Sequence, residues 1–221
     1  MGVFDQYDPI QYNIRYAATL HVFDPHGGIP QDPKIIEGWL RSKFSDSDEL
    51  VQEMVMRTLE ELGKPLDDEH LEDAIESISA KRVNGFYRAP DGQLAIRGRH
   101  IKAGIKEAAN ILWAKDRWGP TNKGTRSFFA EHVFIPEDFI PLGVTEPAGI
   151  DQRQVNTFRG TSFNYEEYVL DVYPEFTVIT DHEFTDEQWG RLWVVFQRNG
   201  LGASRSQGFG TFEVIKWDRL N

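Results

Sequence analysis

The sequence has 221 residues, of which 40% are hydrophobic, 13% aromatic and 27% charged, so it is long enough to bury a core and has the composition of a globular protein. It contains no cysteine, which excludes disulfides, thiolate metal sites and cysteine nucleophiles, and no stretch approaches the ~18 apolar residues of a membrane span. The opening MGVFDQYDPIQYN lacks the basic start and the apolar run of a signal peptide, so we expect a cytoplasmic protein with no membrane partner.

Charge is distributed unevenly along the chain. The formal net charge is -11, from 24 basic and 35 acidic residues, which argues against sequence-blind attraction to nucleic acid. Residues 45–76 hold twelve acidic residues against Arg57 and Lys64, a net charge of -10, whereas residues 97–126 hold eight basic residues against Glu107 and Asp116, a net charge of +6. These two blocks are either solvated helix faces or two binding surfaces of opposite sign.

The first part of the chain predicts one strand followed by helices. Residues 14–22 form an apolar, β-prone run that ends at a loop rich in proline and glycine. Apolar residues at helical spacing then predict helices over residues 33–44, 47–62 and 67–79. Asp32 and Pro33 mark the first helix start, and Gly63 ends the second helix. We expect residues of about 45–82 to be an acidic helical insertion.

The remaining elements alternate between strands and helices. A Pro-Asp-Gly turn predicts a hairpin of residues 85–88 and 94–96, and Thr185 with Gln188 fits a capping box. Helices are expected at 101–115 and 185–199, strands at 130–135, 163–173, 175–179 and 211–217, and surface loops at 119–125 and 136–154. This order suggests an α+β fold with an antiparallel sheet of ferredoxin-like type that carries insertions.

Residues 200–210 read Gly-Leu-Gly-Ala-Ser-Arg-Ser-Gln-Gly-Phe-Gly and stand between a helix and the final strand. Glycines permit positive φ and a close approach of the backbone to phosphate, and the side chains of Ser204, Arg205 and Ser206 are suited to bind it. The segment is neither a P-loop nor a dinucleotide fingerprint, because no Gly-Lys-Ser/Thr follows and it runs from helix to strand. The alternative is a tight turn that holds a helix against a sheet.

This loop and the strand after it resemble the glycine-rich loop of the RAMP superfamily of CRISPR-associated RNA-binding proteins. Residues 96–109, Ile-Arg-Gly-Arg-His-Ile-Lys-Ala-Gly-Ile-Lys-Glu-Ala-Ala, are similar to the strand-to-helix junction in the backbone subunits of multi-subunit effectors, and Arg159-Gly160 resembles a basic loop of that family. The resemblance covers the first strand and about residues 94–217, and it leaves residues 45–82 unexplained. It implies a single RAMP-like domain over residues 1–221 with an RRM-like core, which binds guide RNA and associates with copies of itself and other effector subunits.

The same resemblance implies a set of phosphate contacts at the strand-to-helix junction, in the basic loop and in the glycine-rich loop. These are Arg97, Arg99, His100, Lys102, Arg159, Gly200, Gly202, Ser204, Arg205, Ser206, Gly208 and Gly210. Lys106 joins them by geometry alone, since it lies one turn further along the same helix face. A helix N-terminus itself attracts phosphate, which independently favours residues 99–102 as contacts.

The sequence leaves open whether the protein cleaves RNA. Some backbone subunits of the superfamily cut target RNA with an aspartate in the loop after the first strand, which makes Asp24 and Asp32 candidates, although both also suit a turn or a helix cap. Processing ribonucleases of the superfamily use a histidine near the N-terminus as general base, so that His21 or His26 is a candidate for a metal-independent endoribonuclease.

Two further expectations concern partners and cofactors. The acidic residues 45–76 are alternatively an interaction module that docks onto a basic partner. Trp118 and Phe158 lie in basic, loop-like surroundings where an RNA base could stack. We expect no metal ion and no cofactor, because the chain has neither cysteine nor a His-x-x-x-His pair.

Overall fold

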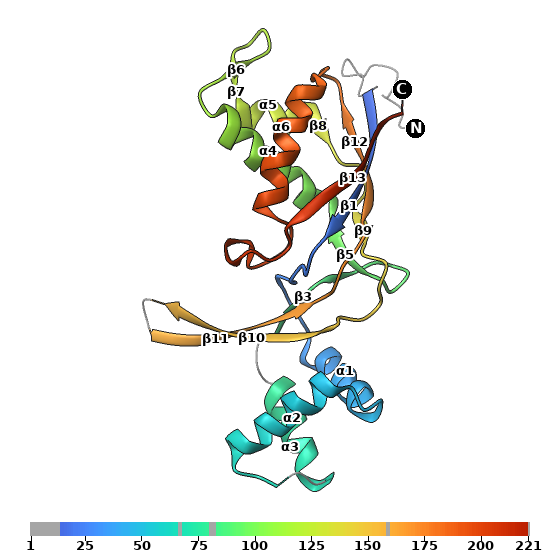
Figure 1. Cartoon of the computed structure of the whole chain (residues 1–221), viewed down its shortest axis with the longest axis vertical. Coiled ribbons are helices and arrows are strands. Elements are labelled where there is room, and N and C mark those ends of the chain that lie inside the picture. The colour runs from blue at the N-terminus through green and yellow to red at the C-terminus, as the bar shows by residue number, and fades with distance from the viewer. Residues whose placement is uncertain (1–13, 66–67, 80–82, 158–159, 221) are drawn as a thin grey trace, which may run out of the picture. The chain divides into compact units, whose positions relative to one another are not determined.

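A computed structural model describes residues 14–65, 68–79, 83–157 and 160–220 (Figure 1). The chain divides into two compact units, each assembled from separated segments. Unit 1 consists of Met1–Pro25, Tyr87–Glu146 and Leu170–Asn221, and unit 2 consists of His26–Phe86 and Pro147–Val169. The single RAMP-like domain over residues 1–221 stays a prediction, and the expected insertion at 45–82 falls within unit 2.

Unit 1 is built on a four-stranded antiparallel sheet. Its strands lie in the order β13 (Phe212–Arg219), β1 (Ile14–Val22), β12 (Glu175–Thr180) and β8 (Val133–Phe134). Helix α4 (Gly98–Trp113) precedes β8 in the chain, and α6 (Asp186–Asn199) connects β12 to β13 (Figure 1). A β-α-β-β-α-β order with the last strand beside the first is the ferredoxin-like arrangement, so the predicted α+β, ferredoxin-like class is confirmed.

The core of unit 1 lies between this sheet and helices α4 and α6. Alternate residues of β1 are buried because successive side chains of a strand point to opposite faces. Tyr16 stacks on Trp217 of β13, with 4.5 Å between ring centroids, and contacts Trp189 of α6 edge-on at 5.5 Å. Thr185 accepts from the backbone of Gln188 in the expected capping box, which fixes where α6 begins.

Smaller elements complete unit 1, and two predictions for this part of the chain are wrong. A three-stranded sheet contains β4 (Tyr87–Arg88), β5 (Leu94–Arg97) and β9 (Phe139–Pro141). Its first two strands form the predicted hairpin. In a separate sheet, β6 (Arg117–Trp118) pairs with β7 (Lys123–Gly124). The strand expected at 130–135 is wrong over its first half, because α5 (Thr125–His132) continues to His132 and only β8 follows. The loop expected at 136–154 is wrong because it contains β9 and the beginning of β10.

Unit 2 packs three helices against one face of a second sheet. The helices are α1 (Pro33–Ser45), α2 (Glu49–Leu62) and α3 (Asp68–Ser79), and the sheet order is β10 (Gly149–Thr157), β11 (Gly160–Tyr168), β3 (Val83–Gly85) and β2 (Ile29–Pro30). Asp32 caps α1 and Gly63, at φ +68°, ends α2, as expected. The core cluster contains Ile36, Leu40, Val51, Val55, Leu59, Ala74, Ile75, Ile78, Val83 and Ile150.

No helix in the described part of the chain is long and apolar enough to cross a membrane.

Candidate nucleic-acid interface

The glycine-rich loop folds back on itself where α6 ends. The Leu201 N–H donates to the Gly210 carbonyl at 2.7 Å, and the Gly210 N–H donates to the carbonyl of Phe23, at the end of β1, at 3.0 Å. Gly210 has φ +69°, and a Cβ there would lie 1.8 Å from the Leu201 carbonyl oxygen. Glycine is therefore required at 210 for the loop to close. Between these ends, Arg205–Gln207 form one turn of 3-10 helix.

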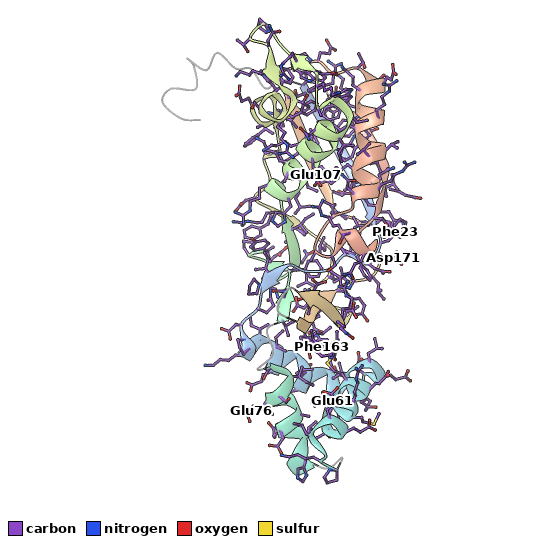
Figure 2. All side chains as sticks on the ribbon, turned by 90° about the vertical axis from the view of Figure 1, so that its left-hand side faces the viewer. Phe23, Glu61, Glu76, Glu107, Phe163 and Asp171 are labelled. Carbon is purple, nitrogen blue, oxygen red and sulfur yellow. The ribbon has the colours of Figure 1, made fainter. Side chains whose placement is uncertain are left out.

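Arg205 connects this loop to helix α4. Its guanidinium donates to Glu107 with an N–O distance of 2.9 Å, and both side chains remain more than a third exposed. Glu107 follows Lys106 directly on the outer side of α4 (Figure 2). The two sequence segments that carry the RAMP resemblance thus lie next to each other on unit 1, although they are far apart in the chain.

Helix α4 presents a line of basic side chains beside this contact. Arg99, Lys102 and Lys106 follow one another at intervals of three and four residues, which places them along one side of a helix. Burial, followed by the neighbouring charge of Lys106, lowers the pKa of Lys102. Its ammonium lies 5.4 Å from the Phe134 ring centroid, within cation-π range. Lys106 makes no ion pair with any described residue, so its charge is available to a ligand.

The basic side chains at the junction before α4 are bound mainly by other residues of the protein. Arg97 donates to Asp138 at 2.9 Å and lies over the ring of Phe139, with 4.1 Å to the centroid. Arg99 donates to the Tyr87 hydroxyl at 2.7 Å. Burial, followed by the charges of Arg99 and Arg97, lowers the pKa of His100, which favours its neutral form.

The predicted RNA contacts therefore separate into two groups. Lys102, Lys106 and Arg205 belong to one partly exposed surface, whereas Arg97 is held mainly by its own protein neighbours. Arg159 lies outside the described residues. Sequence reasoning treated Glu107 only as an opposing charge and missed its contact with Arg205. The sequence feature that could have indicated this contact is a lone acidic residue on the outer face of a basic helix.

The catalytic candidates occupy different surroundings. Asp24 is exposed in the loop after β1, at φ +42°. Asp32 accepts from the Lys34 N–H at 2.9 Å as the cap of α1. His26 is only 2% exposed, and its Nε2 lies 3.3 Å from Asp151. This burial argues against contact between His26 and an RNA ribose.

His21, the alternative base, lies within an aromatic cluster of unit 1. Its ring is 4.2 Å from Phe23 and 4.6 Å from Tyr173, measured between centroids. Nε2 of His21 lies 3.1 Å from Asp171, and its side chain remains 21% exposed. Figure 2 labels Phe23 and Asp171 at this place. A carboxylate that contacts one ring nitrogen fixes the orientation of the imidazole.

Trp118 does not lie in an open loop. Its ring stacks on Phe128 at 5.3 Å and meets Trp113 edge-on at 5.5 Å, and its Nε1 donates to Thr125 at 3.0 Å. Packing of this kind uses the ring faces that an RNA base would need, so the stacking prediction for Trp118 is disfavoured. The companion candidate Phe158 lies outside the described residues.

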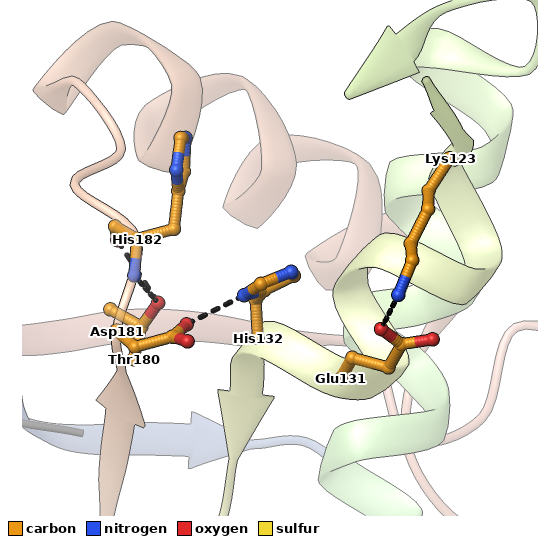
Figure 3. A network of polar contacts seen from close by, with 6 residues as sticks. All are labelled: Lys123, Glu131, His132, Thr180, Asp181 and His182. Carbon is orange, nitrogen blue, oxygen red and sulfur yellow. Dashed lines mark hydrogen bonds and ion pairs between the residues drawn. The ribbon is translucent and has the colours of Figure 1, made fainter. Parts of the chain in front are cut away.

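A polar network borders this aromatic cluster (Figure 3). His132 Nδ1 lies 2.8 Å from Asp181, and the Thr180 hydroxyl bonds both the N–H and the carbonyl of His182 at 3.0 Å. Burial, followed by the charge of His132, lowers the pKa of His182. Within the described ranges, no group of three or more His, Asp or Glu residues is arranged to hold a metal ion.

Comparisons with known proteins assign no family. No family model matches the sequence, and no curated protein matches it. Among solved structures, the chain is similar to a chain of one titled "Cryo-EM structure of the Type III-B Cmr-beta bound to cognate target RNA", with 10% sequence identity and a TM-score of 0.49. The match covers 98% of this chain and 64% of that chain.

Proposed function

We propose that this protein binds RNA through its phosphate backbone and is a subunit of a CRISPR-type ribonucleoprotein that holds guide RNA. The binding surface consists of the outer side of α4 and the glycine-rich loop. The observation that carries the proposal is the 2.9 Å contact between Arg205 and Glu107, since it joins the two segments of the sequence that resemble RAMP proteins. The ferredoxin-like order of unit 1 agrees with this resemblance.

The chemistry of the surface suits phosphate better than bases. Lys102 and Lys106 supply ammonium groups, which act as compact point charges, and Arg205 supplies a planar guanidinium that can bond two phosphate oxygens. Glu107 holds Arg205 in place before RNA arrives and so reduces the conformational entropy that binding must remove. A nearby phosphate also favours the charged form of Lys102, whose pKa is lowered in the free protein.

The test is the affinity for a labelled single-stranded RNA of about 30 nucleotides, measured by fluorescence anisotropy at several salt concentrations. Each phosphate neutralised on a single strand contributes about 0.7 to the slope of log K against log salt. Lys106→Ala and Arg205→Ala should each weaken binding and reduce that slope by about this amount. A control is Arg191→Ala on α6, which removes an exposed cation paired with Glu187 outside the surface.

Two results would contradict the proposal. One is a salt dependence near zero for the unmodified protein, and the other is an equal effect of Lys106→Ala and Arg191→Ala. The same proposal includes assembly of this protein with further copies of itself, which needs a separate test. In size-exclusion chromatography the purified protein should elute as large particles, and both their size and their 260 nm absorbance should fall after ribonuclease treatment.

A second candidate function is RNA cleavage without a metal ion. The observation that favours it is the contact between His21 and Asp171, because an oriented, partly exposed imidazole can act as general base on a ribose 2'-OH. Such a reaction leaves a 2',3'-cyclic phosphate on the product. His21→Ala should abolish this product, and retention of the cyclic ends in the variant would exclude His21 as the base.

A further inference from the structure

A pocket of about 300 Å³ opens in unit 2, between α2 and the first residues of β10. One wall is the side of α2 that carries Leu50, Glu53, Met54 and Arg57. The opposite wall is residues 149–152 together with two tyrosines of β11. All of these residues belong to unit 2. Its volume is at the lower end of the range for small-ligand sites.

Three of the residues that line the pocket are aromatic. Trp39 of α1, Tyr165 and Tyr168 all line the pocket. The indole Nε1 of Trp39 is buried and finds no hydrogen-bond partner in the described part of the chain. Aromatic faces attract cations, most strongly when these are guanidinium groups that can also stack.

One carboxylate at the pocket is placed to receive such a cation. Glu53 lies on the exposed side of α2 and makes no hydrogen bond or ion pair with any described residue. Asp151 also borders the pocket, but it follows Ile150, which packs into the core cluster with the helices, so its side chain points to the opposite face of the sheet. On that face its Oδ2 lies 2.7 Å from Arg153 and 3.3 Å from His26.

The surroundings add to the negative potential. Arg153 also pairs with the buried Glu166, so one guanidinium is shared between two carboxylates. Arg57 also lines the pocket, and its Nε lies 3.6 Å from Glu61, which offsets its charge. Helices α2 and α3 carry most of the acidic residues of segment 45–76 (Figure 2). This charge repels phosphate and favours a basic ligand.

We propose that this pocket binds an arginine side chain in a basic segment of a partner protein. The guanidinium stacks on the aromatic lining and donates to Glu53, while Leu50 and Met54 cover the aliphatic part of the side chain. Arginine is preferred to lysine because its planar guanidinium can bond both oxygens of one carboxylate and also stack on a ring face. The site lies in unit 2, so it does not depend on the RNA surface proposed for unit 1.

The test uses three capped pentapeptides with identical Gly-Ser flanks and a central arginine, lysine or citrulline. Each is titrated into the full chain labelled with ¹⁵N, and the indole signal of Trp39 and the amides of residues 150–152 are followed by NMR. The arginine peptide should shift these signals saturably and bind more tightly than the lysine peptide. The neutral citrulline peptide should bind at least about fivefold more weakly than the arginine peptide.

Variants separate a specific contact from general acidity. Glu53→Gln should weaken the arginine peptide about fivefold, whereas Glu76→Gln should leave its affinity unchanged. Glu76 is also exposed and acidic, but it lies on α3 outside the lining. Arg205→Ala, which tests the RNA surface, should not change peptide binding.

Three results would overturn the proposal. The first is equal affinity for the arginine and citrulline peptides, and the second is an equal effect of Glu53→Gln and Glu76→Gln. The third is a saturable shift of the Trp39 and 150–152 signals by a single-stranded RNA oligonucleotide with no shift by the arginine peptide, which would assign the pocket to nucleic acid.

Discussion

Closure of the glycine-rich loop can be tested with a matched pair of substitutions, Gly210→Ala and Gly208→Ala. Both residues have positive φ, at +69° and +94°, so both variants incur the cost of a left-handed conformation, about 1–2 kcal/mol. Only at position 210 does a Cβ meet other atoms, at 1.8 Å from the Leu201 carbonyl oxygen, whereas nothing lies within 4 Å of a Cβ at position 208.

The difference between the two variants follows from that contact. An alanine at 210 must move the backbone apart, which breaks the 2.7 Å hydrogen bond from the Leu201 N–H to the Gly210 carbonyl. The loss of such a bond contributes about 0.5–1.5 kcal/mol. We therefore expect the free energy of unfolding to fall by about 1.5–3.5 kcal/mol for Gly210→Ala and by about 1–2 kcal/mol for Gly208→Ala.

The assay is urea denaturation followed by circular dichroism. The midpoint should fall further for Gly210→Ala than for Gly208→Ala, with an unchanged slope m in both variants. RNA affinity measured on the folded variants should follow the same order, because displacement of the loop also displaces Arg205 from Glu107. Equal midpoints for the two variants would refute the close approach at Gly210 and the loop closure inferred from it.

Three other substitutions test separate features. Glu107→Gln removes the carboxylate that pairs with Arg205. RNA binding should become weaker, about two- to fivefold, because Arg205 is no longer held in place before RNA arrives; tighter binding would mean that Glu107 acts only as a repulsive charge and would contradict this positioning role. Asp48→Ala removes the side chain that accepts from the Leu50 and Val51 N–H groups at the start of α2, and should reduce the free energy of unfolding by about 1 kcal/mol in a urea titration. The lowered pKa of His182 means that its contribution to stability is complete above the ordinary value of 6.5 and is lost as the pH falls through the folded-state pKa. Thermal melts at pH values from about 7.5 to about 5.5 should therefore show a smaller decrease in melting temperature for His182→Gln than for the unmodified protein, and equal decreases would contradict this linkage.

Local signals in the sequence predicted most elements well. The run at 14–22 became β1 with the same bounds, and Asp32, Gly63 and the Thr185 capping box marked helix ends correctly. These signals work because a cap or a turn is satisfied by residues within a few positions of each other. The order of the elements was then sufficient to predict a ferredoxin-like sheet.

Contacts between distant segments were not predictable in this way. The strand predicted over residues 130–135 includes the last three residues of α5, because a short apolar run next to a strand suits either structure. The pair of Arg205 and Glu107 joins residues 98 positions apart. Neither residue carries a local signal for the other, so the sequence nominated the loop and the helix without predicting their contact.

The pairing of β1 has a consequence for how the protein is made. Strand β1 ends at Val22, but its two neighbours in the sheet begin only at Glu175 and Phe212. A ribosome adds about 5–20 residues per second, so β1 is synthesised many seconds before the two strands that pair with it. During this time Leu20 and Val22 are exposed to water. The nascent chain is therefore vulnerable to aggregation until translation has passed β13, which ends at Arg219. Slower synthesis should prolong this period and increase the need for a chaperone that covers unpaired strands.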